Sequence, residues 1–286
     1  MTDACPFHKQ SAPAALSSAD LEAHRYTTSE FEDLKRDMDA LAPAIAWVND
    51  FVKQGNPDLG RTGVVCPFVP ESTRQDMLQY FVLNVELAPD LGREAKEEDY
   101  AAVIEPAVLN LRDQFMANRI TDPKVRLLYA YLIVFRGLDL ETERASWLIE
   151  KIQRRLKPKF VEAGLMIGEF HPFSNALGLR NPDFRPLRSP VPLLSFRNMV
   201  EIDFVFLSRK YDPAPLRVHF LTSYLRHMGA DLGASARLKA ESALEEAHQE
   251  VLQASSLSSE KEWAALASET ERLASAASIR ECPHIG

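Results

Sequence analysis

The chain has 286 residues, of which 46% are hydrophobic and 26% charged, and its formal net charge is -8. These values are typical of a soluble globular protein that can bury one large core or two small ones, and they argue against an extracellular disulfide framework or a disordered chain. Because binding to nucleic acid or to an anionic membrane surface needs a basic face, the acidic balance argues against both roles.

The N-terminal stretch is expected to be a mobile tail. Residues 1–28 are rich in alanine, serine and polar side chains, show no sustained period, and lack the basic start and apolar middle of a signal peptide. No stretch of the sequence approaches the ~20 apolar residues that cross a bilayer. Together with three cysteines, an odd number, these features favour a cytoplasmic protein without a disulfide framework.

The rest of the chain alternates between helical and strand patterns. Apolar residues at spacings of three and four predict helices, and runs of β-branched and aromatic residues predict strands. The predicted helices are 28–52, 97–120, 139–157, 213–229 and 235–252, with a further one over 260–279. The predicted strands are 77–87, 127–135 and 165–170, with a fourth over 190–199.

Prolines mark several boundaries. Pro43 is expected to kink or break the first helix, and the third helix is expected to stop near Lys157, before Pro158. The run VVCPFVP, broken by two prolines, suits an edge strand or an extended loop. The succession of strand, helix and strand predicts an α+β fold: one mixed-sheet core domain with crossover helices over 29–232, then a helical C-terminal arm and tail over 233–286.

The common sequence motifs of hydrolases, kinases, zincins and redox proteins are absent, so the candidate chemistry depends on individual side chains. His171 directly follows the predicted strand 165–170, and ligands bind at this end of the strands in open α/β sheets. Pro172 disfavours helical geometry at His171 and fixes the direction in which the chain leaves the strand. His171 is therefore either a ligand or acid–base group, or a histidine that only hydrogen-bonds a neighbouring backbone group.

An arginine-rich loop stiffened by prolines follows this histidine. Four cationic side chains fall within eighteen residues of an acidic protein: Arg180, Arg185, Arg188 and Arg197. A guanidinium is a planar fork that binds carboxylate or phosphate through two hydrogen bonds, and proline lowers the entropy that the loop loses on ordering. The loop is predicted to be a preformed anion clamp. The alternative is a set of structural ion pairs with nearby carboxylates: Asp183, Glu169 and Glu201.

Each of the three cysteines precedes a proline. Cys66 is a buried thiol, a reactive thiolate near Arg61, or an axial ligand to iron. The terminal pairs would form a zinc site only if the termini met: Cys5 with His8, and Cys282 with His284. His219 and His227, eight residues apart on one predicted helix, are either surface or capping groups or functional ones.

Three stretches of the sequence carry a family resemblance: WVNDFV, NPDLGRTGVVCPFVP and above all GLMIGEFHPFSNALGLRNPDFRPLRSPVPLL. They resemble a family of actinobacterial proteins that carry a domain of unknown function, often found among natural-product genes. The match covers about residues 45–230. This resemblance implies a family without an activity.

A second resemblance carries chemistry. The order of a Cys-Pro element, a strand and helix pair, and an arginine-rich segment before a final strand is similar to the YqcI/YcgG family and related heme-dependent N-oxygenases, including arginine hydroxylases. It implies a heme-dependent monooxygenase that acts on a nitrogen-containing small molecule, an amino acid or derivative, in a biosynthetic pathway.

This second resemblance also implies roles for individual residues. His171 would ligate the heme iron, with Cys66 as the other candidate axial ligand. The heme propionates would be held by the arginines of the loop: Arg180, Arg185 and Arg188. The positive charge of the substrate would be bound by Glu169 or Asp183.

Two other functions remain open on the sequence alone. One is a cofactor-independent enzyme in which His171 is the acid–base group and the arginines clamp an anionic substrate. The other is a non-catalytic accessory protein whose helical arm docks a partner enzyme or a second copy of the chain, which would give a homodimer. The apolar stripe expected on this arm is Leu238, Leu244, Val251 and Leu252, then Trp263, Leu266 and Leu273.

Overall fold

The computed structural model describes residues 28–87, 96–118 and 120–255. The chain divides into two compact units, residues 1–39 and 40–286. The described part of the first unit is the N-terminal portion of helix α2 (Thr28–Trp47), and everything below concerns the second unit. Each helix in the described ranges is too short or too polar to cross a membrane.

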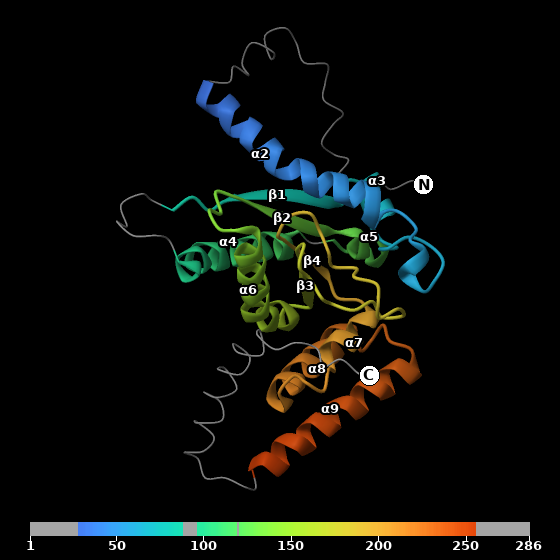
Figure 1. The fold of residues 1–286 in the computed structure, drawn as a ribbon. Coiled ribbons are helices and arrows are strands. Elements are labelled where there is room, and N and C mark those ends of the chain that lie inside the picture. Colours follow the sequence, from blue (N-terminus) through green and yellow to red (C-terminus); the bar gives the residue numbers. More distant parts are fainter. Residues whose placement is uncertain (1–27, 88–95, 119, 256–286) are drawn as a thin grey trace. The chain divides into compact units, whose positions relative to one another are not determined.

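In its described residues, the second unit contains a four-stranded mixed sheet with helices on both faces (Figure 1). The strands are β1 (Leu78–Asn84), β2 (Ala130–Arg136), β3 (Leu165–Phe170) and β4 (Leu193–Asn198), in the order β1-β2-β4-β3. β1 runs parallel to β2, whereas β4 is antiparallel to both β2 and β3. Helix α4 (Glu97–Ala117) crosses between the parallel strands, and α6 (Thr142–Glu162) connects β2 to β3. The predicted α+β fold with one mixed sheet and crossover helices is confirmed.

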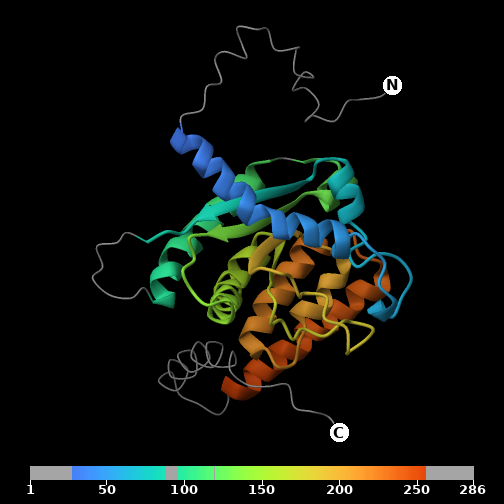
Figure 2. The ribbon, with the colours of Figure 1, turned by 45° about the horizontal axis from the view of Figure 1, so that its top comes forward.

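The remaining elements lie before β1, before β2 and after β4. The first group is the π-helical turn η2 (Val48–Val52), the 3-10 turn η3 (Pro57–Leu59) and α3 (Val69–Arg74). The short helix α5 (Pro123–Leu128) precedes β2. The last group is η5 (Glu201–Asp203), α7 (Phe204–Leu207), α8 (Ala214–Met228) and α9 (Ala234–Ser255). α8 packs against α6, and α9 lies alongside α8 (Figures 1 and 2).

The two faces of the sheet have different cores, because successive residues of a strand point to opposite sides. On one face, Leu132 of β2 packs in the same cluster as Ala44, in the C-terminal part of α2. On the other face, Phe196 of β4 contacts Phe115 of α4 and Phe160 of α6, with ring centroids 5.3 and 5.0 Å apart. The face toward α6 is the one that matters for the site described below.

The predicted end of the third helix is wrong, because α6 continues through Pro158 to Glu162 instead of stopping at Lys157. A proline inside a helix removes one N–H donor and weakens the turn around it. Two histidines of α8 stabilise this turn from outside. A ring nitrogen of His219 hydrogen-bonds the Pro158 carbonyl at 3.2 Å, and one of His227 hydrogen-bonds the Glu162 carbonyl at 2.8 Å. Both histidines are thus capping groups.

The run VVCPFVP forms no edge strand. Val64 makes a single β-bridge with Gly55, and the chain then bends until α3 begins at Val69. Pro70 lies in the first turn of α3, where a missing N–H is tolerated because no helical partner exists for it. The alternative prediction, an irregular extended loop, describes the first part of the run.

The described part of the C-terminal arm is helical, as expected, but the predicted apolar stripe is covered only in part. Leu244 and Val251 are half-buried, whereas Leu238 and Leu252 are 64% and 58% exposed. The face that is covered carries alanines, and Ala240 packs with Phe220 and Tyr224 of α8. Three predictions lie outside the described residues: the helix 260–279, the apolar side chains on it, and the terminal cysteine–histidine pairs.

Candidate functional site

His171 lies at the end of β3, against helix α6. Its side chain is 1% exposed, and its ring meets that of Trp147 edge to face, with centroids 5.5 Å apart. The backbone N–H of His171 donates to the Leu187 carbonyl at 3.2 Å, and its carbonyl accepts from the Ser174 N–H at 3.2 Å. The chain therefore turns immediately after the strand, as expected for a residue followed by Pro172.

The two ring nitrogens of His171 have different surroundings. Nε2 lies 3.6 Å from Oε2 of Glu150, and Arg154, one helical turn along α6, binds the other oxygen of that carboxylate. Burial raises the pKa of Glu150, but His171 and Arg154 outweigh burial and bring it below its ordinary value. Nδ1 is buried and has no hydrogen-bond partner in the described part of the chain. Nδ1 is therefore the atom that a ligand could engage.

More ionisable groups gather on the same side of the sheet. Glu169 belongs to the strand face that looks toward α6, and burial raises its pKa. Burial lowers the pKa of Lys157 of α6, whose Nζ donates to the Phe206 carbonyl at 3.1 Å. Burial also raises the pKa of Asp212, in the loop between α7 and α8. Shifted pKa values of this kind are concentrated at functional sites, because burial and neighbouring charges tune groups for binding and proton transfer.

The loop between β3 and β4 is anchored to the turn that contains η3. Phe184 is buried, and its ring lies 6.0 Å from that of Phe51. The side-chain amide of Asn181 donates to the Asp58 carbonyl at 2.7 Å. Within the loop, the Gly178 N–H donates to the Phe184 carbonyl at 2.9 Å. These contacts anchor the β3–β4 loop to the segment before β1.

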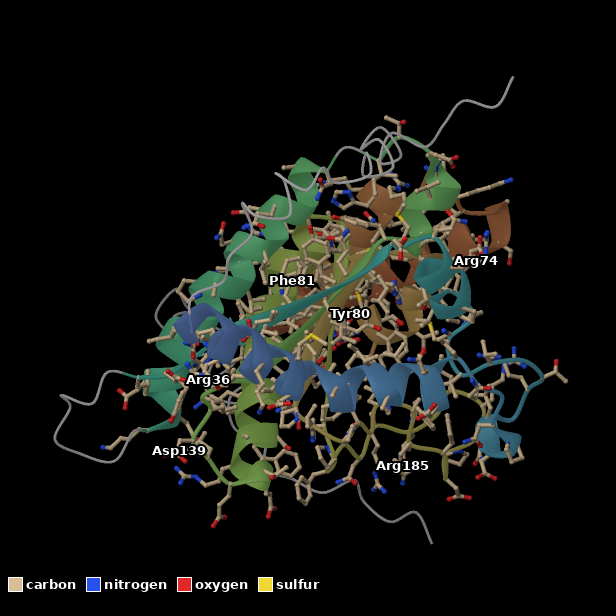
Figure 3. The ribbon with its side chains drawn as sticks, turned by 90° about the horizontal axis from the view of Figure 1, so that it is seen from above. Arg36, Arg74, Tyr80, Phe81, Asp139 and Arg185 are labelled. Atoms are coloured by element: carbon tan, nitrogen blue, oxygen red, sulfur yellow. The ribbon has the colours of Figure 1, made fainter. Side chains whose placement is uncertain are left out.

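The three predicted clamp arginines lie on this loop but differ in their contacts. Nε of Arg188 donates to the Ser174 carbonyl at 3.1 Å, close to His171. Arg185 donates to backbone carbonyls of the loop, and Figure 3 shows its side chain directed outward. Arg180 is exposed. Among the described residues none of the three guanidinium groups forms an ion pair, so the alternative of structural pairs with Asp183, Glu169 and Glu201 is not seen.

Arg197, grouped with these arginines on sequence spacing, is a structural residue. It lies on β4, and its Nη1 and Nη2 donate to Asp203 at 2.7 and 2.8 Å. Burial opposes the charge of Arg197, but the hydrogen bonds from its guanidinium to Asp203 outweigh burial and raise its pKa. This pairing ties β4 to η5.

Cys66 lies apart from the His171 cluster. It packs in the core that includes Leu132, on the face of the sheet away from α6. The guanidinium of Arg61 donates to carbonyls of its own loop instead of activating this thiol: those of Thr62, Val64 and Val65. Asp183 is exposed on the β3–β4 loop, where its backbone N–H donates to the Asn181 side chain at 2.9 Å.

Sequence reasoning missed Glu150, Arg154 and Asp212. The helical pattern gave little signal for Glu150, because this residue lies beside the buried stripe that contains Ile149 and Ile152. Its side chain is nevertheless only 16% exposed, and a carboxylate buried to this extent needs a partner. No comparable pattern marks Asp212, which only the tertiary fold brings near α6.

The fold and the site define an α+β sheet domain with a buried cluster of ionisable side chains at the end of one strand. Residues 41–239 match a domain of unknown function, DUF6875, and the chain belongs to this family. The matched range contains the whole sheet, the β3–β4 loop and the cluster around His171. No curated protein and no solved structure was found to match the chain.

Proposed function

We propose that this protein is a heme-dependent oxygenase that acts on a nitrogen-containing small molecule, an amino acid or derivative, in a biosynthetic pathway. The observation that carries the proposal is the unpartnered Nδ1 of buried His171. Metal-binding imidazoles are commonly oriented by a carboxylate at their second nitrogen, and Glu150 faces Nε2 of this ring. With its proton on Nε2, the ring has a lone pair on Nδ1 that can ligate iron.

The β3–β4 loop has the two chemical characters that heme requires of its surroundings. Heme is a broad apolar ring with two carboxylates at one edge. The loop exposes apolar side chains, namely Phe173, Leu177 and Leu179. It also carries three arginines that form no ion pair with any residue the structure describes, namely Arg180, Arg185 and Arg188. A bound apolar ring would cover surface that otherwise contacts water, and the guanidinium forks match propionates.

The chain's own residues would position the reactants, while heme would supply the activation of O₂. Arg154 holds Glu150, and Oε2 of Glu150 lies 3.6 Å from Nε2 of His171, where it would orient the ring. Trp147 packs against that ring and helps to exclude water from it. Of the two carboxylates proposed to bind a cationic substrate, Glu169 is favoured over Asp183, because it lies two residues before His171 on the strand face toward α6, whereas Asp183 is exposed on the loop.

Expression with a heme precursor tests this proposal. The purified protein should be coloured and show a Soret band, and His171→Ala should abolish or shift that band. The matched control is His248→Ala, which removes an exposed histidine of α9 and should leave the spectrum unchanged. A colourless protein that also fails to take up added hemin would contradict the proposal. An unchanged spectrum in His171→Ala would move the iron ligand to Cys66, His219 or His227.

The second candidate is a cofactor-independent enzyme in which His171 transfers protons. The same Glu150–His171 pair favours it, because a carboxylate that orients an imidazole makes it a competent general base. In this case the protein should be colourless and should be stabilised against heat by phosphate or carboxylate metabolites. If every such anion leaves the melting temperature unchanged, this candidate fails.

The proposal includes a cytoplasmic location and allows a homodimer. Light scattering on the purified protein measures the second property directly. A purely accessory role, in which the arm docks a partner, has less support, because α9 packs on α8 of its own chain.

A further inference from the structure

Of the other buried polar atoms without a hydrogen-bond partner in the described residues, two belong to the cluster near His171. They are Nη1 of Arg154, which is a donor, and Oδ2 of Asp212, which is an acceptor. Leaving such atoms unpaired costs free energy, and more so when the groups are charged. The two atoms carry opposite charges, yet they do not satisfy each other.

Hydrogen bonds fix the side chain of Arg154 and the backbone of Asp212. Arg154 is fixed through Nη2, which binds Glu150 one turn earlier on α6. The backbone of Asp212 is fixed at both ends: its N–H donates to the Arg209 carbonyl at 3.0 Å, and its own carbonyl accepts from Nε of Arg217 at 3.0 Å. Arg217 is 3% exposed and forms an ion pair with Glu250 of α9. The positions from which the two unpaired atoms project are therefore fixed by the fold.

The two side chains act on the same small region. The positive charge of Arg154 is felt by both Tyr211 and Asp212. Burial raises the pKa of Asp212, and the cations Lys157, Arg209, Arg217 and Arg154 oppose that rise without hydrogen-bonding its Oδ2. The Arg154 side chain is 36% exposed and Tyr211 is 75% exposed, so solvent reaches this region from one side.

We propose that Arg154 and Asp212 form a binding site for a small zwitterion. Nη1 of Arg154 donates to the ligand's carboxylate, and Oδ2 of Asp212 accepts from its ammonium group. A molecule with both charges satisfies both buried atoms and brings no net charge into the cluster, which a simple anion or amine cannot do.

This inference deepens the proposed function and rests on it for the claim that the bound molecule is the substrate. Glu150 contacts both Arg154 and His171. A zwitterion bound to Arg154 would therefore be separated from the proposed iron ligand, His171, only by the carboxylate of Glu150. The binding itself does not require heme, so it can be measured with or without the cofactor.

Titration calorimetry with four probes tests the site. Norleucine and 6-aminohexanoate are zwitterions with different spacings of the two charges, whereas hexanoate and pentylamine carry one charge each. At least one zwitterion should bind wild-type protein ten- to a hundredfold more tightly than either singly charged probe, since one charge-assisted hydrogen bond corresponds to about this factor. If neither zwitterion binds more tightly than hexanoate or pentylamine, the proposal is overturned.

Matched variants locate the binding. Asp212→Asn and Arg154→Gln should each weaken zwitterion binding about ten- to a hundredfold, while the exposed controls Asp231→Asn and Arg155→Gln should not. Unchanged binding in a folded Asp212→Asn overturns the assignment, and the wild-type comparison still decides if that variant does not fold. The Soret band separates the two proposals: zwitterion binding to protein that takes up no heme refutes the oxygenase alone, and a normal heme spectrum without zwitterion binding refutes this site alone.

Discussion

The substitution Asp203→Asn would show whether Arg197 stabilises the fold or binds a ligand. Asp203 is fully buried and accepts hydrogen bonds from both terminal nitrogens of Arg197, and its Oδ2 also accepts from the Val200 N–H at 2.8 Å. Asparagine keeps the shape of the side chain but turns one of the two oxygens into a donor. That donor would face the guanidinium or the backbone N–H.

The expected cost follows from the burial of the pair. Removing one partner of a buried ion pair costs about 3–5 kcal/mol, because the other charge is left uncompensated. The Arg197 side chain retains 29% exposure, so water can solvate part of its charge. We therefore expect the free energy of unfolding to fall by about 2–4 kcal/mol.

Urea denaturation followed by circular dichroism measures this loss. The control is Glu241→Gln, which breaks the exposed pair between Arg237 and Glu241 on α9 and should change the free energy of unfolding by less than about 0.5 kcal/mol. A loss below about 1 kcal/mol for Asp203→Asn, accompanied by weaker heme or anion binding, would refute the structural assignment. Arg197 would then belong with the clamp arginines.

Four more predictions concern the loop, the sheet edge, the cluster and the arm. Replacing Arg180, Arg185 or Arg188 by Lys should weaken heme binding, measured by absorbance titration, about tenfold or more. The same replacement should change the free energy of unfolding by less than about 0.5 kcal/mol. A variant that only melts at a lower temperature and binds heme normally would show that the arginines have a structural role. Gly164→Ala should lower the free energy of unfolding, measured by urea denaturation, by about 2–3 kcal/mol, because φ is +77° at Gly164 and an added Cβ would lie 2.8 Å from the His227 ring. Part of this loss should vanish in a His227→Ala background. Burial raises the pKa of Glu150, but His171 and Arg154 outweigh burial and lower this pKa overall. The stability that Glu150 contributes should therefore be present above about pH 4.5, its pKa in the unfolded chain, and be lost as pH falls through its pKa in the folded protein. Glu150→Gln should remove this part of the acid dependence of stability. Deleting residues 233–286 should cause aggregation by uncovering the α8 face, and a soluble, folded product that only loses self-association would instead support a docking arm.

Periodicity was enough to predict the main elements but not their arrangement. The strand expected over 165–170 occurs as Leu165–Phe170, because a short apolar run after a helix has few other ways to fold. The insertion of β4 between β2 and β3 could not be predicted, since neither strand pattern records its neighbour. Pro158 misled for a related reason: the donors that stabilise the end of α6 come from α8, some sixty residues later.

The site was predictable only where local sequence determines it. His171 was found because a strand precedes it and a proline follows it, and the structure places it at that strand end. Its partner Glu150 was missed, because a contact across 21 residues depends on how α6 packs against β3. Spacing alone also grouped Arg197 with the loop arginines, although Arg197 lies near the end of β4 that is farther from the loop.

The two α8 histidines have a consequence for the motion of α6. Pro158 has no N–H, so the carbonyl of Arg154 lacks its usual helical donor and the helix is weakest directly after a residue of the proposed zwitterion site. Fraying that begins at Glu162 would pass through the last turn before it reached that point, but His219 and His227 fasten this turn to α8. The last turn of α6 and the whole of α8 should therefore open together, and their amide protons should exchange with solvent at a common rate.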